Sequence, residues 1–347
     1  MNNKNIKFGL FTDIHFGARQ NSTLHNQDNL DFIDWFIEQV KIKKCNRIGF
    51  LGDWFENRNS INIETLDMSY QALKKLDALD MPIYFIVGNH DLYRRNTRDV
   101  HSVNIFNEFK NIVVVDRPTV AEEEFLFCPF IFEHEYPSLA QYSKQRIWMG
   151  HFEFKGFVLT GAHMKSEHGL NHELFKNQKF ILSGHYHKRQ AQGNTVYIGN
   201  PFPTNYGDAG DVSRGMAIYD HSNESLDFED WPKCPTFLRT KLSDVLAGEW
   251  KLPPNDRMRV SCVNDVELSY SEAQMVKEAM KEQYNFREFN LEENYADRKD
   301  ALTNTETEEE ISESQSIDEV VINLLGDINE IKSLDSAKLV AIYKELK

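Results

Sequence analysis

The chain has 347 residues, of which 41% are apolar and 12% aromatic. This composition can build a large core, so wholesale disorder is excluded. The sequence has no run of 18 apolar residues, and its first residues lead into a strand-like segment without the apolar stretch of a secretion signal. We therefore expect a cytoplasmic protein that neither spans nor binds a membrane.

The formal net charge of −15 is unevenly distributed along the chain. Residues 265–347 carry 21 acidic against 9 basic side chains, which leaves residues 1–264 with a net charge of only −3. Affinity for nucleic acid depends largely on Lys and Arg, and bound divalent metal ions add positive charge at a site. A nucleic-acid substrate is therefore permitted, although the sequence predicts no broad basic surface.

Nine short runs rich in β-branched or aromatic residues predict strands, because each ends at a polar or glycine-containing stretch. These runs are 6–11, 47–51, 83–87, 112–115, 125–128, 146–149, 180–182, 196–198 and 216–219. Between the early runs, residues 29–43 and 65–79 carry apolar side chains at helical spacing. The alternation of strands and helices predicts a layered α/β domain over residues 1–235.

The rest of the chain changes character twice. Residues 236–292 are predicted to form a small α+β subdomain, and residues 293–316, rich in acidic and small polar side chains, have the composition of a flexible linker. The elements predicted in the subdomain are strands around 257–263 and 286–291 and a helix over 271–283. Residues 317–347 carry two apolar stripes at helical spacing, and such short helices need a surface on which to dock.

Five polar clusters occur immediately after predicted strands. They are Asp13-Ile14-His15, Gly52-Asp53, Gly88-Asn89-His90-Asp91, Gly150-His151 and Gly184-His185-Tyr186-His187. Each cluster alone could equally be a structural feature, such as a helix cap or a structural histidine, or part of a functional site. Five such clusters, each after a strand, would be an improbable coincidence as structural features. Because the carboxyl ends of parallel strands converge, we expect a single site. Its mixed oxygen and nitrogen donors suit Mn, Fe or Zn rather than Ca, and they are too numerous for one ion.

The ordered set D-x-H, G-D, G-N-H-D, G-H and G-H-x-H, over roughly residues 6–220, resembles the calcineurin-like metallophosphoesterases. The flanking Trp54-Phe55 and the C-terminal parts are most similar to the SbcD-type DNA-repair nucleases, and among them to the recombination endonuclease subunits of tailed phages. If this chain is phage-encoded, we expect it in the host cytoplasm. The resemblance implies a four-layer β-sandwich flanked by helices. It also implies a DNA-capping domain over 236–292 and binding of an SMC-like ATPase of the SbcC type by residues 317–347.

The resemblance further implies a ligand set for two divalent metal ions, Mn²⁺ or alternatively Mg²⁺. One ion would be held by Asp13, His15 and His187, the other by Asn89, His151 and His185, and Asp53 would bridge both. A shared carboxylate lowers the repulsion between two neighbouring cations, which together can clamp a phosphodiester and activate a water molecule.

Two further residues of the G-N-H-D motif are implied to be catalytic. His90 would donate a proton to the leaving 3′ oxygen, and Asp91 would orient the His90 ring and raise its pKa. One departure from the family lies three positions after the bridging aspartate, where many relatives have a histidine and this chain has Glu56. A carboxylate cannot supply positive charge to the transition state there, so either Arg58 substitutes or the chemical step is slower.

Two basic residues, Lys188 and Arg189, follow the last ligand motif, and we treat them as candidate phosphate contacts; the alternative is a solvated surface. The resemblance implies a homodimeric exonuclease on duplex DNA ends and endonuclease on single strands, which works with the ATPase in double-strand-break repair. The alternative is a small-molecule phosphodiesterase of the same superfamily, which would leave the parts of the chain after residue 235 unexplained.

Overall fold

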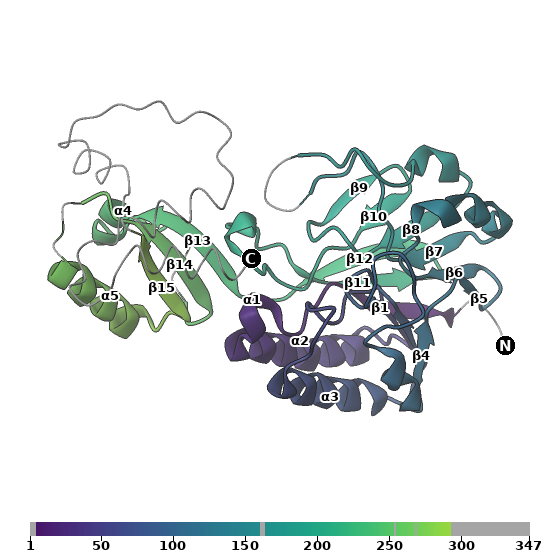
Figure 1. Ribbon diagram of the computed structural model, residues 1–347, viewed down its shortest axis with the longest axis horizontal. Coiled ribbons are helices and arrows are strands. Elements are labelled where there is room, and N and C mark those ends of the chain that lie inside the picture. Colours follow the sequence, from purple (N-terminus) through teal and green to yellow (C-terminus); the bar gives the residue numbers. More distant parts are fainter. Residues whose placement is uncertain (1–4, 160–163, 253–254, 267, 269, 293–347) are drawn as a thin grey trace, which may run out of the picture. The chain divides into compact units, whose positions relative to one another are not determined.

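The computed structural model describes residues 5–159, 164–252, 255–266, 268 and 270–292 (Figure 1). The predicted acidic linker and the predicted partner-binding helices, residues 293–347, lie outside the described residues. Within the described part of the chain, no helix is both long and apolar enough to cross a membrane.

Two six-stranded sheets form the predicted sandwich (Figure 1). The first has the order β12-β11-β1-β2-β3-β4, in which β1 to β4 run parallel and β11 is antiparallel to both of its neighbours. Its strands are β1 Lys7–Phe11, β2 Arg47–Phe50, β3 Ile83–Ile86, β4 Ile112–Val115, β11 Gly215–Asp220 and β12 Ser225–Asp230. The parallel strands therefore end at one edge of the sheet.

The second sheet has the order β5-β6-β7-β8-β10-β9, with a parallel centre and an antiparallel strand at each edge. Its strands are β5 Thr119–Ala121, β6 Phe125–Cys128, β7 Ile147–Gly150, β8 Phe180–Ser183, β9 Gln190–Gln192 and β10 Thr195–Tyr197. The main core lies between the two sheets, where Phe8 of β1 packs against Phe125 of β6 with ring centroids 5.3 Å apart.

Helices cover the outer face of the first sheet (Figure 1). The side chains of a strand alternate between its two faces, so Phe8 points between the sheets and Phe11 points to α2, where its ring lies 4.6 Å from that of Phe36. Gly9 lies under α2, where a Cβ atom would be 2.9 Å from Val40. The elements outside the sheets are α1 Ala18–Asn21, α2 Thr23–Ile42, α3 Ile63–Asp77 and the 3₁₀ segments η2 Asn104–Glu108, η3 Glu133–Tyr142, η4 His172–Phe175 and η5 Tyr206–Asp208.

A third, smaller sheet follows and has its own core. Its parallel strands β13 Thr236–Lys241, β14 Met258–Val263 and β15 Glu288–Glu292 are accompanied by α4 Leu242–Leu246 and α5 Tyr270–Tyr284. Leu238, Leu242, Val260 and Phe289 belong to one buried cluster that is separate from the core of the sandwich.

The predicted fold class and all nine strands predicted in the first 235 residues are confirmed, while four strands were not predicted. Strands β5 and β9 are short and partly exposed, β12 alternates polar and apolar residues at a sheet edge, and β13 follows Pro235 directly. Helix α2 begins at Thr23 rather than at the predicted residue 29. Asn26, Asp28 and Asn29 are buried polar residues in its first turns, so apolar periodicity could not reveal this part.

The buried carboxylate of Asp28 joins α2 to the third sheet through arginines. Arg259 Nη2 lies 2.7 Å from Asp28 Oδ2, and Arg287 Nη2 lies 3.1 Å from Oδ1. Arg257 Nη1 is 3.5 Å from the same Oδ1. Asp28 is fully buried and Arg259 is 2% exposed. Removal of the carboxylate would leave a buried cation without a counter-charge.

Replacement of Asp28 by alanine is expected to lower the free energy of unfolding by about 3 to 5 kcal/mol, the usual loss when one partner of a buried ion pair is removed. The matched control is Asp34→Ala on the same helix, because Asp34 pairs with Lys75 at 2.7 Å with both side chains exposed. That control should cost less than about 1 kcal/mol. Urea unfolding of both variants measures the difference, and equal losses would contradict the role of Asp28.

Candidate dinuclear metal centre

The predicted site residues all lie in loops that leave the carboxyl ends of parallel strands. The loops that supply them are Asp13 to His15 after β1, Asp53 after β2, Asn89 to Asp91 after β3, His151 after β7 and His185 to His187 after β8. Both sheets of the sandwich therefore contribute, and residues up to 174 positions apart in the sequence are brought together.

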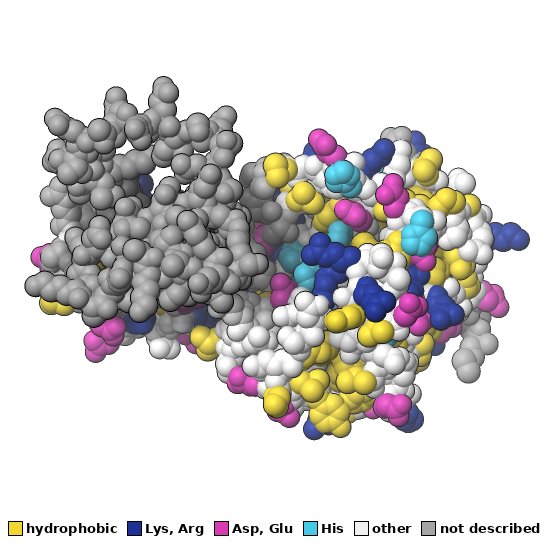
Figure 2. Space-filling model, viewed as in Figure 1, with side chains coloured by type: hydrophobic (Ala, Val, Ile, Leu, Met, Phe, Trp, Pro, Cys, Tyr) yellow, Lys and Arg dark blue, Asp and Glu magenta, His cyan; other side chains and the backbone are white. Residues whose placement is uncertain are grey.

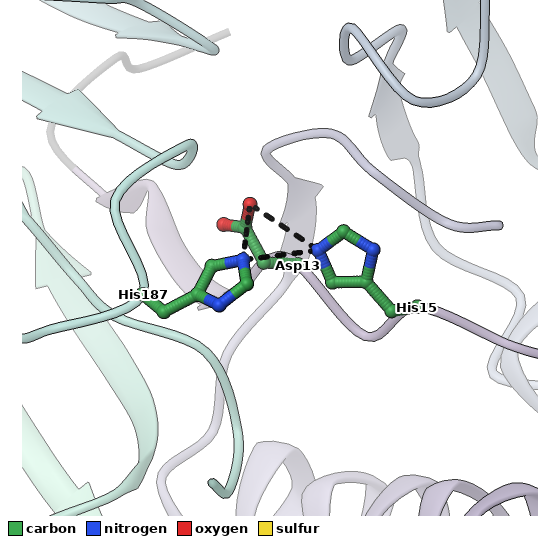
Figure 3. Close-up of side chains that lie close together, drawn as sticks. All are labelled: Asp13, His15 and His187. Carbon is green, nitrogen blue, oxygen red and sulfur yellow. Dashed lines mark hydrogen bonds and ion pairs between the residues drawn. The ribbon is translucent and has the colours of Figure 1, made fainter. Parts of the chain in front are cut away.

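One group of donor atoms consists of Asp13, His15 and His187 (Figure 3). The Nε2 atoms of the two histidines lie 3.1 Å apart, and Asp13 Oδ1 lies 4.0 Å from that of His15 and 3.9 Å from that of His187. Two imidazole nitrogens this close repel unless a proton or a cation lies between them. The chemistry of this donor set fits a divalent cation.

A second group consists of Asn89, His151 and His185. Asn89 Oδ1 lies 2.9 Å from His151 Nε2 and 2.9 Å from His185 Nδ1. Asp53 Oδ2 lies between the two groups, 3.3 Å from His151 Nε2 and 3.9 Å from His15 Nε2. The seven predicted ligands are thus brought together, and their arrangement fits two cations with one shared carboxylate.

Backbone N–H groups orient the two carboxylates. His90 N donates to Asp53 Oδ1 at 2.7 Å, which leaves Oδ2 facing the histidine rings. His185 N lies 3.1 Å from each carboxylate oxygen of Asp13. The ring of His151 is oriented in the same way, because its Nδ1 lies 2.7 Å from the carbonyl of Leu51. A carbonyl only accepts, so Nδ1 carries the proton and Nε2 faces Asp53.

Four of the predicted ligand residues have left-handed backbone conformations. The φ angles are 51° at Asp13, 49° at His15, 61° at Asp53 and 92° at His185. Residues other than glycine rarely adopt such angles, and they cluster at functional sites where the surrounding structure holds them. The sharp turns direct four side chains back over the strand ends.

Two glycines allow the loops to pass close to the side chains of the predicted ligands. A Cβ atom at Gly52, where φ is 103°, would lie 2.3 Å from Nδ1 of His151, and one at Gly88 would lie 2.2 Å from Oδ1 of Asp53. Both distances are far below van der Waals contact. The glycines of the G-D and G-N-H-D motifs therefore let two loops pass beside ligand side chains.

The predicted pairing of Asp91 with the His90 ring is wrong. Asp91 is fully buried, and its carboxylate accepts hydrogen bonds from the backbone N–H groups of Gly88, Asp53, Trp54 and Phe55 at 2.9 to 3.2 Å. Burial and the neighbouring Asp53 carboxylate raise the pKa of Asp91 to about 7. Asp91 thus holds the loops after β2 and β3 together.

The ring of His90 is held by a different group. Its Nδ1 lies 2.8 Å from the carbonyl oxygen of Glu56, so this nitrogen is the donor and Nε2 is free to exchange a proton. The ring centroid lies 5.0 Å from that of His15, in an edge-to-face arrangement. His90 therefore lies beside the first donor group.

Three residues contact the loops that carry predicted ligands, although sequence reasoning gave them no such role. Arg214 is 1% exposed and donates to the carbonyl of His187 and to Asp211. His25 Nε2 lies 3.1 Å from the carbonyl of His15, and Asn26 Oδ1 accepts from the N–H of Gly17 at 2.8 Å. No local motif marks these contacts with the loops, because each of them is made to a main-chain atom.

The two candidate phosphate contacts have different surroundings. Lys188 is exposed next to His187. Arg189 pairs with Asp230 at 2.7 Å, and its guanidinium lies 4.2 Å from the ring centroid of Phe228. Contact with a phosphate would therefore require Arg189 to exchange Asp230 for the substrate, whereas Lys188 faces solvent directly.

The four predicted ligand histidines fall into two pairs by the direction in which their pKa values are shifted. Burial disfavours protonation of all four, but the carboxylates of Glu56 and Asp53 outweigh it at His15 and raise its pKa to about 9. Asp53 and Asp13 likewise raise the pKa of His151 to about 9. Burial lowers the pKa of His185 to about 3 and that of His187 well below its usual value, and neighbouring histidines add to both effects.

Binding of Mn²⁺ to the metal-free protein is therefore expected to release protons. At pH 7 both ring nitrogens of His15 and of His151 are expected to be protonated, since the pKa values of about 9 lie above that pH, and one nitrogen of each ring must lose its proton to bind a metal ion. Calorimetric titration in buffers of different ionisation enthalpy should give about two protons released at pH 7, and the number should fall as the pH rises through about 9. A release near zero at pH 7 would contradict this assignment.

The chain is similar to one protein family and to several known proteins. The chain matches the family described as calcineurin-like phosphoesterase over residues 6–189, more than half of its length. Exonuclease subunit 1 of Enterobacteria phage T4 is 28% identical over 223 residues, which are 62% of this chain and 65% of that protein. The DNA double-strand break repair protein Mre11 of Methanocaldococcus jannaschii is 23% identical over 263 residues, 69% of this chain and 70% of that protein. Among solved structures, a dimetal phosphatase from Danio rerio is 13% identical with a TM-score of 0.36, over 61% of this chain and 91% of its own.

The match to the phage relative spans slightly less than two thirds of that protein's length. The family match covers all the strand-end loops that carry the predicted site residues. Supporting residues after position 189, such as Arg214, lie outside it. Members of this family use a dinuclear metal site, and the structure has candidate metal-binding groups among the strand-end loops. The chain belongs to the calcineurin-like phosphoesterase family.

Proposed function

We propose that the chain is a two-metal-dependent DNA nuclease that acts as an exonuclease on duplex ends and as an endonuclease on single strands. The observation that carries this proposal is the position of Asp53 Oδ2 between two donor groups, 3.3 Å from His151 Nε2 and 3.9 Å from His15 Nε2. The names of the two relatives, an exonuclease subunit and a double-strand break repair protein, support DNA as the substrate.

Seven residues hold the cations in this proposal. They are Asp13, His15 and His187 for one ion, Asn89, His151 and His185 for the other, and Asp53 for both. Two divalent cations would supply the positive charge that stabilises a phosphodiester on the way to its transition state and would activate the attacking water. The mixture of imidazole and oxygen donors favours Mn²⁺ over Mg²⁺, which prefers oxygen.

His90 is the proposed proton donor to the leaving 3′ oxygen. Its Nδ1–H is engaged by the Glu56 carbonyl, so Nε2 is the nitrogen that would gain and then deliver the proton. Asp91 acts indirectly, because it fixes the loops that carry Asp53 and Asn89. This role replaces the direct contact with His90 that the sequence had predicted.

The alternative, a small-molecule phosphodiesterase, would use the same metal ligands. DNA is favoured by two features beyond the relatives' names. Lys and Arg side chains lie beside histidines on the face shown in Figure 2, where they would attract a polyanion. The third sheet, within residues 236–292, adds a separate folded part after the sandwich, for which we propose the DNA-capping role.

Incubation with linear duplex DNA and with a small phosphodiester, each with Mn²⁺ or Mg²⁺ and with or without EDTA, tests the proposal. We expect metal-dependent DNA hydrolysis, and Asp53→Asn should lower its rate by more than about a hundredfold because the shared carboxylate is lost. His90→Asn should also lower turnover but keep both metal ions.

Metal counting and circular dichroism on the purified variants provide the controls. A natively folded Asp53→Asn variant with a near-normal rate would contradict the bridging role. Loss of a full metal equivalent in His90→Asn would make His90 a ligand rather than an acid. Activity confined to the small phosphodiester would favour the alternative function.

We further propose that the protein is a homodimer that pairs through α3 and η2. Leu66 and Tyr70 of α3 and Ile105 of η2 are 39%, 50% and 59% exposed. They border a surface hollow of about 400 Å³ whose other walls include Phe106 and Phe109. Hydrophobic side chains also gather around α3 in Figure 2, and an exposed apolar patch of this kind is typical of an interface.

A second partner is proposed for residues 317–347, on the basis of their sequence. Their two apolar stripes would dock as a helical segment onto the coiled-coil base of an SbcC-like, SMC-type ATPase. The predicted linker, residues 293–316, would let this segment bind a partner at a distance from the sandwich.

Truncation after Asn304 should leave metal-dependent nuclease activity nearly unchanged and abolish co-purification with such an ATPase. The truncated chain should still sediment as a dimer, because α3 and η2 are retained. Sedimentation, pull-down and nuclease assays measure the three properties. Retained ATPase binding, or a monomeric truncated chain beside a dimeric full chain, would contradict the assignment of these surfaces.

A further inference from the structure

The loop that carries Glu56 runs beside the loop that carries the first ligand histidine. Three main-chain hydrogen bonds link the two loops. Asp13 N donates to Gly52 O at 2.9 Å, and His15 N donates to Asp53 O at 3.2 Å. Glu56 N donates to the carbonyl oxygen of Phe16 at 3.0 Å. These hydrogen bonds fix the position of the Glu56 main chain. Glu56 therefore has a defined position relative to His15, although its side chain is 43% exposed.

The carboxylate of Glu56 lies against the His15 ring on the edge away from the other ligands. Glu56 Oε2 is 2.8 Å from Nδ1 of His15. The opposite ring nitrogen, Nε2, faces His187 Nε2 at 3.1 Å and Asp13 Oδ1 at 4.0 Å. His15 Nδ1 is fully enclosed, and in the described part of the chain this ion-pair contact with Glu56 is made without a hydrogen bond of regular geometry.

A neutral imidazole has one N–H and one lone pair, so the partner of one nitrogen decides the state of the other. A carboxylate only accepts, and its place beside Nδ1 puts the N–H of His15 there. The lone pair is then on Nε2, which faces the donor group. Carboxylates that contact the remote nitrogen of a metal-bound histidine orient the ring and raise its basicity.

We propose that Glu56 is a positioning residue that orients His15 as a metal ligand. This inference rests on the proposed function, because it takes His15 to be a ligand. It also gives a use to the carboxylate at a position where many relatives have histidine. The side chain of Glu56 serves His15 and its main-chain carbonyl serves His90, so side-chain substitutions leave the His90 contact in place.

Calorimetric titration of the full-length protein with Mn²⁺ tests the proposal without an activity assay. The wild type is expected to bind two ions, and Glu56→Ala should weaken one of them by about ten- to a hundredfold with the other unchanged. Glu56→Gln, whose amide oxygen still accepts from Nδ1, should lie between the two. The matched control is Glu124→Gln, since Glu124 is 38% exposed and lies 3.7 Å from Nε2 of His221, which is not a ligand.

Each outcome distinguishes the inference from the proposed function. Two unchanged affinities in both Glu56 variants overturn the role of Glu56 and leave the proposed function intact. A wild type that binds fewer than two ions overturns the proposed function and this inference with it. A wild type that binds three ions, one of which is lost in Glu56→Ala, makes Glu56 a ligand and also overturns the positioning role. Thermal unfolding in EDTA confirms that the variants are folded.

Discussion

The carboxylate of Asp91 is the interaction on which the rest of the site depends. It is buried, and it accepts hydrogen bonds from four main-chain N–H groups, three of the loop after β2 and one of the loop after β3. These two loops carry Asp53 and Asn89. Without a common acceptor, four buried N–H groups would have no partner, at a cost of about 1 to 3 kcal/mol each. Asp91 thus sets the separation of two ligand-bearing loops without contacting a ligand ring.

The grouping of the candidate ligand residues could be predicted because its signal is local. Each follows an apolar run, and a strand in a parallel arrangement delivers the residue after it to a common edge. His151 and His185 illustrate this, since each comes directly after a strand and a glycine although they belong to a different sheet from Asp53. The pattern of strands and the order of the polar residues were therefore sufficient to predict which side chains lie together at the candidate site.

The supporting contacts could not be predicted because they depend on side-chain direction and on the main chain. Asp91 is adjacent to His90 in sequence, yet its side chain points into the loops while the ring of His90 points to the site. Glu56 was interpreted by comparison with histidine at its position, whereas its use follows from a neighbouring loop 41 residues away. Arg214 acts on a carbonyl, which no sequence pattern marks.

The same difficulty explains the start of α2, where polar side chains replace the apolar periodicity that signals a helix. Asn26 and Asp28 are buried because one serves the loop after β1 and the other serves arginines of the third sheet. Because these positions are polar, the first turns of α2 lack the apolar periodicity from which the helix could have been predicted. Predicted features of residues 293–347 lie outside the described residues and stay predictions.

The left-handed turns at the ligands also limit how this protein can be engineered. At Asp13, His15, Asp53 and His185 the backbone favours glycine, while the chemistry demands a carboxylate or an imidazole. A glycine at any of the four would relax the chain and remove a donor atom. Selection for thermal stability alone would therefore favour glycine at these turns and remove predicted ligands. Stabilising substitutions have to be sought elsewhere, for example at exposed apolar positions of the described surface.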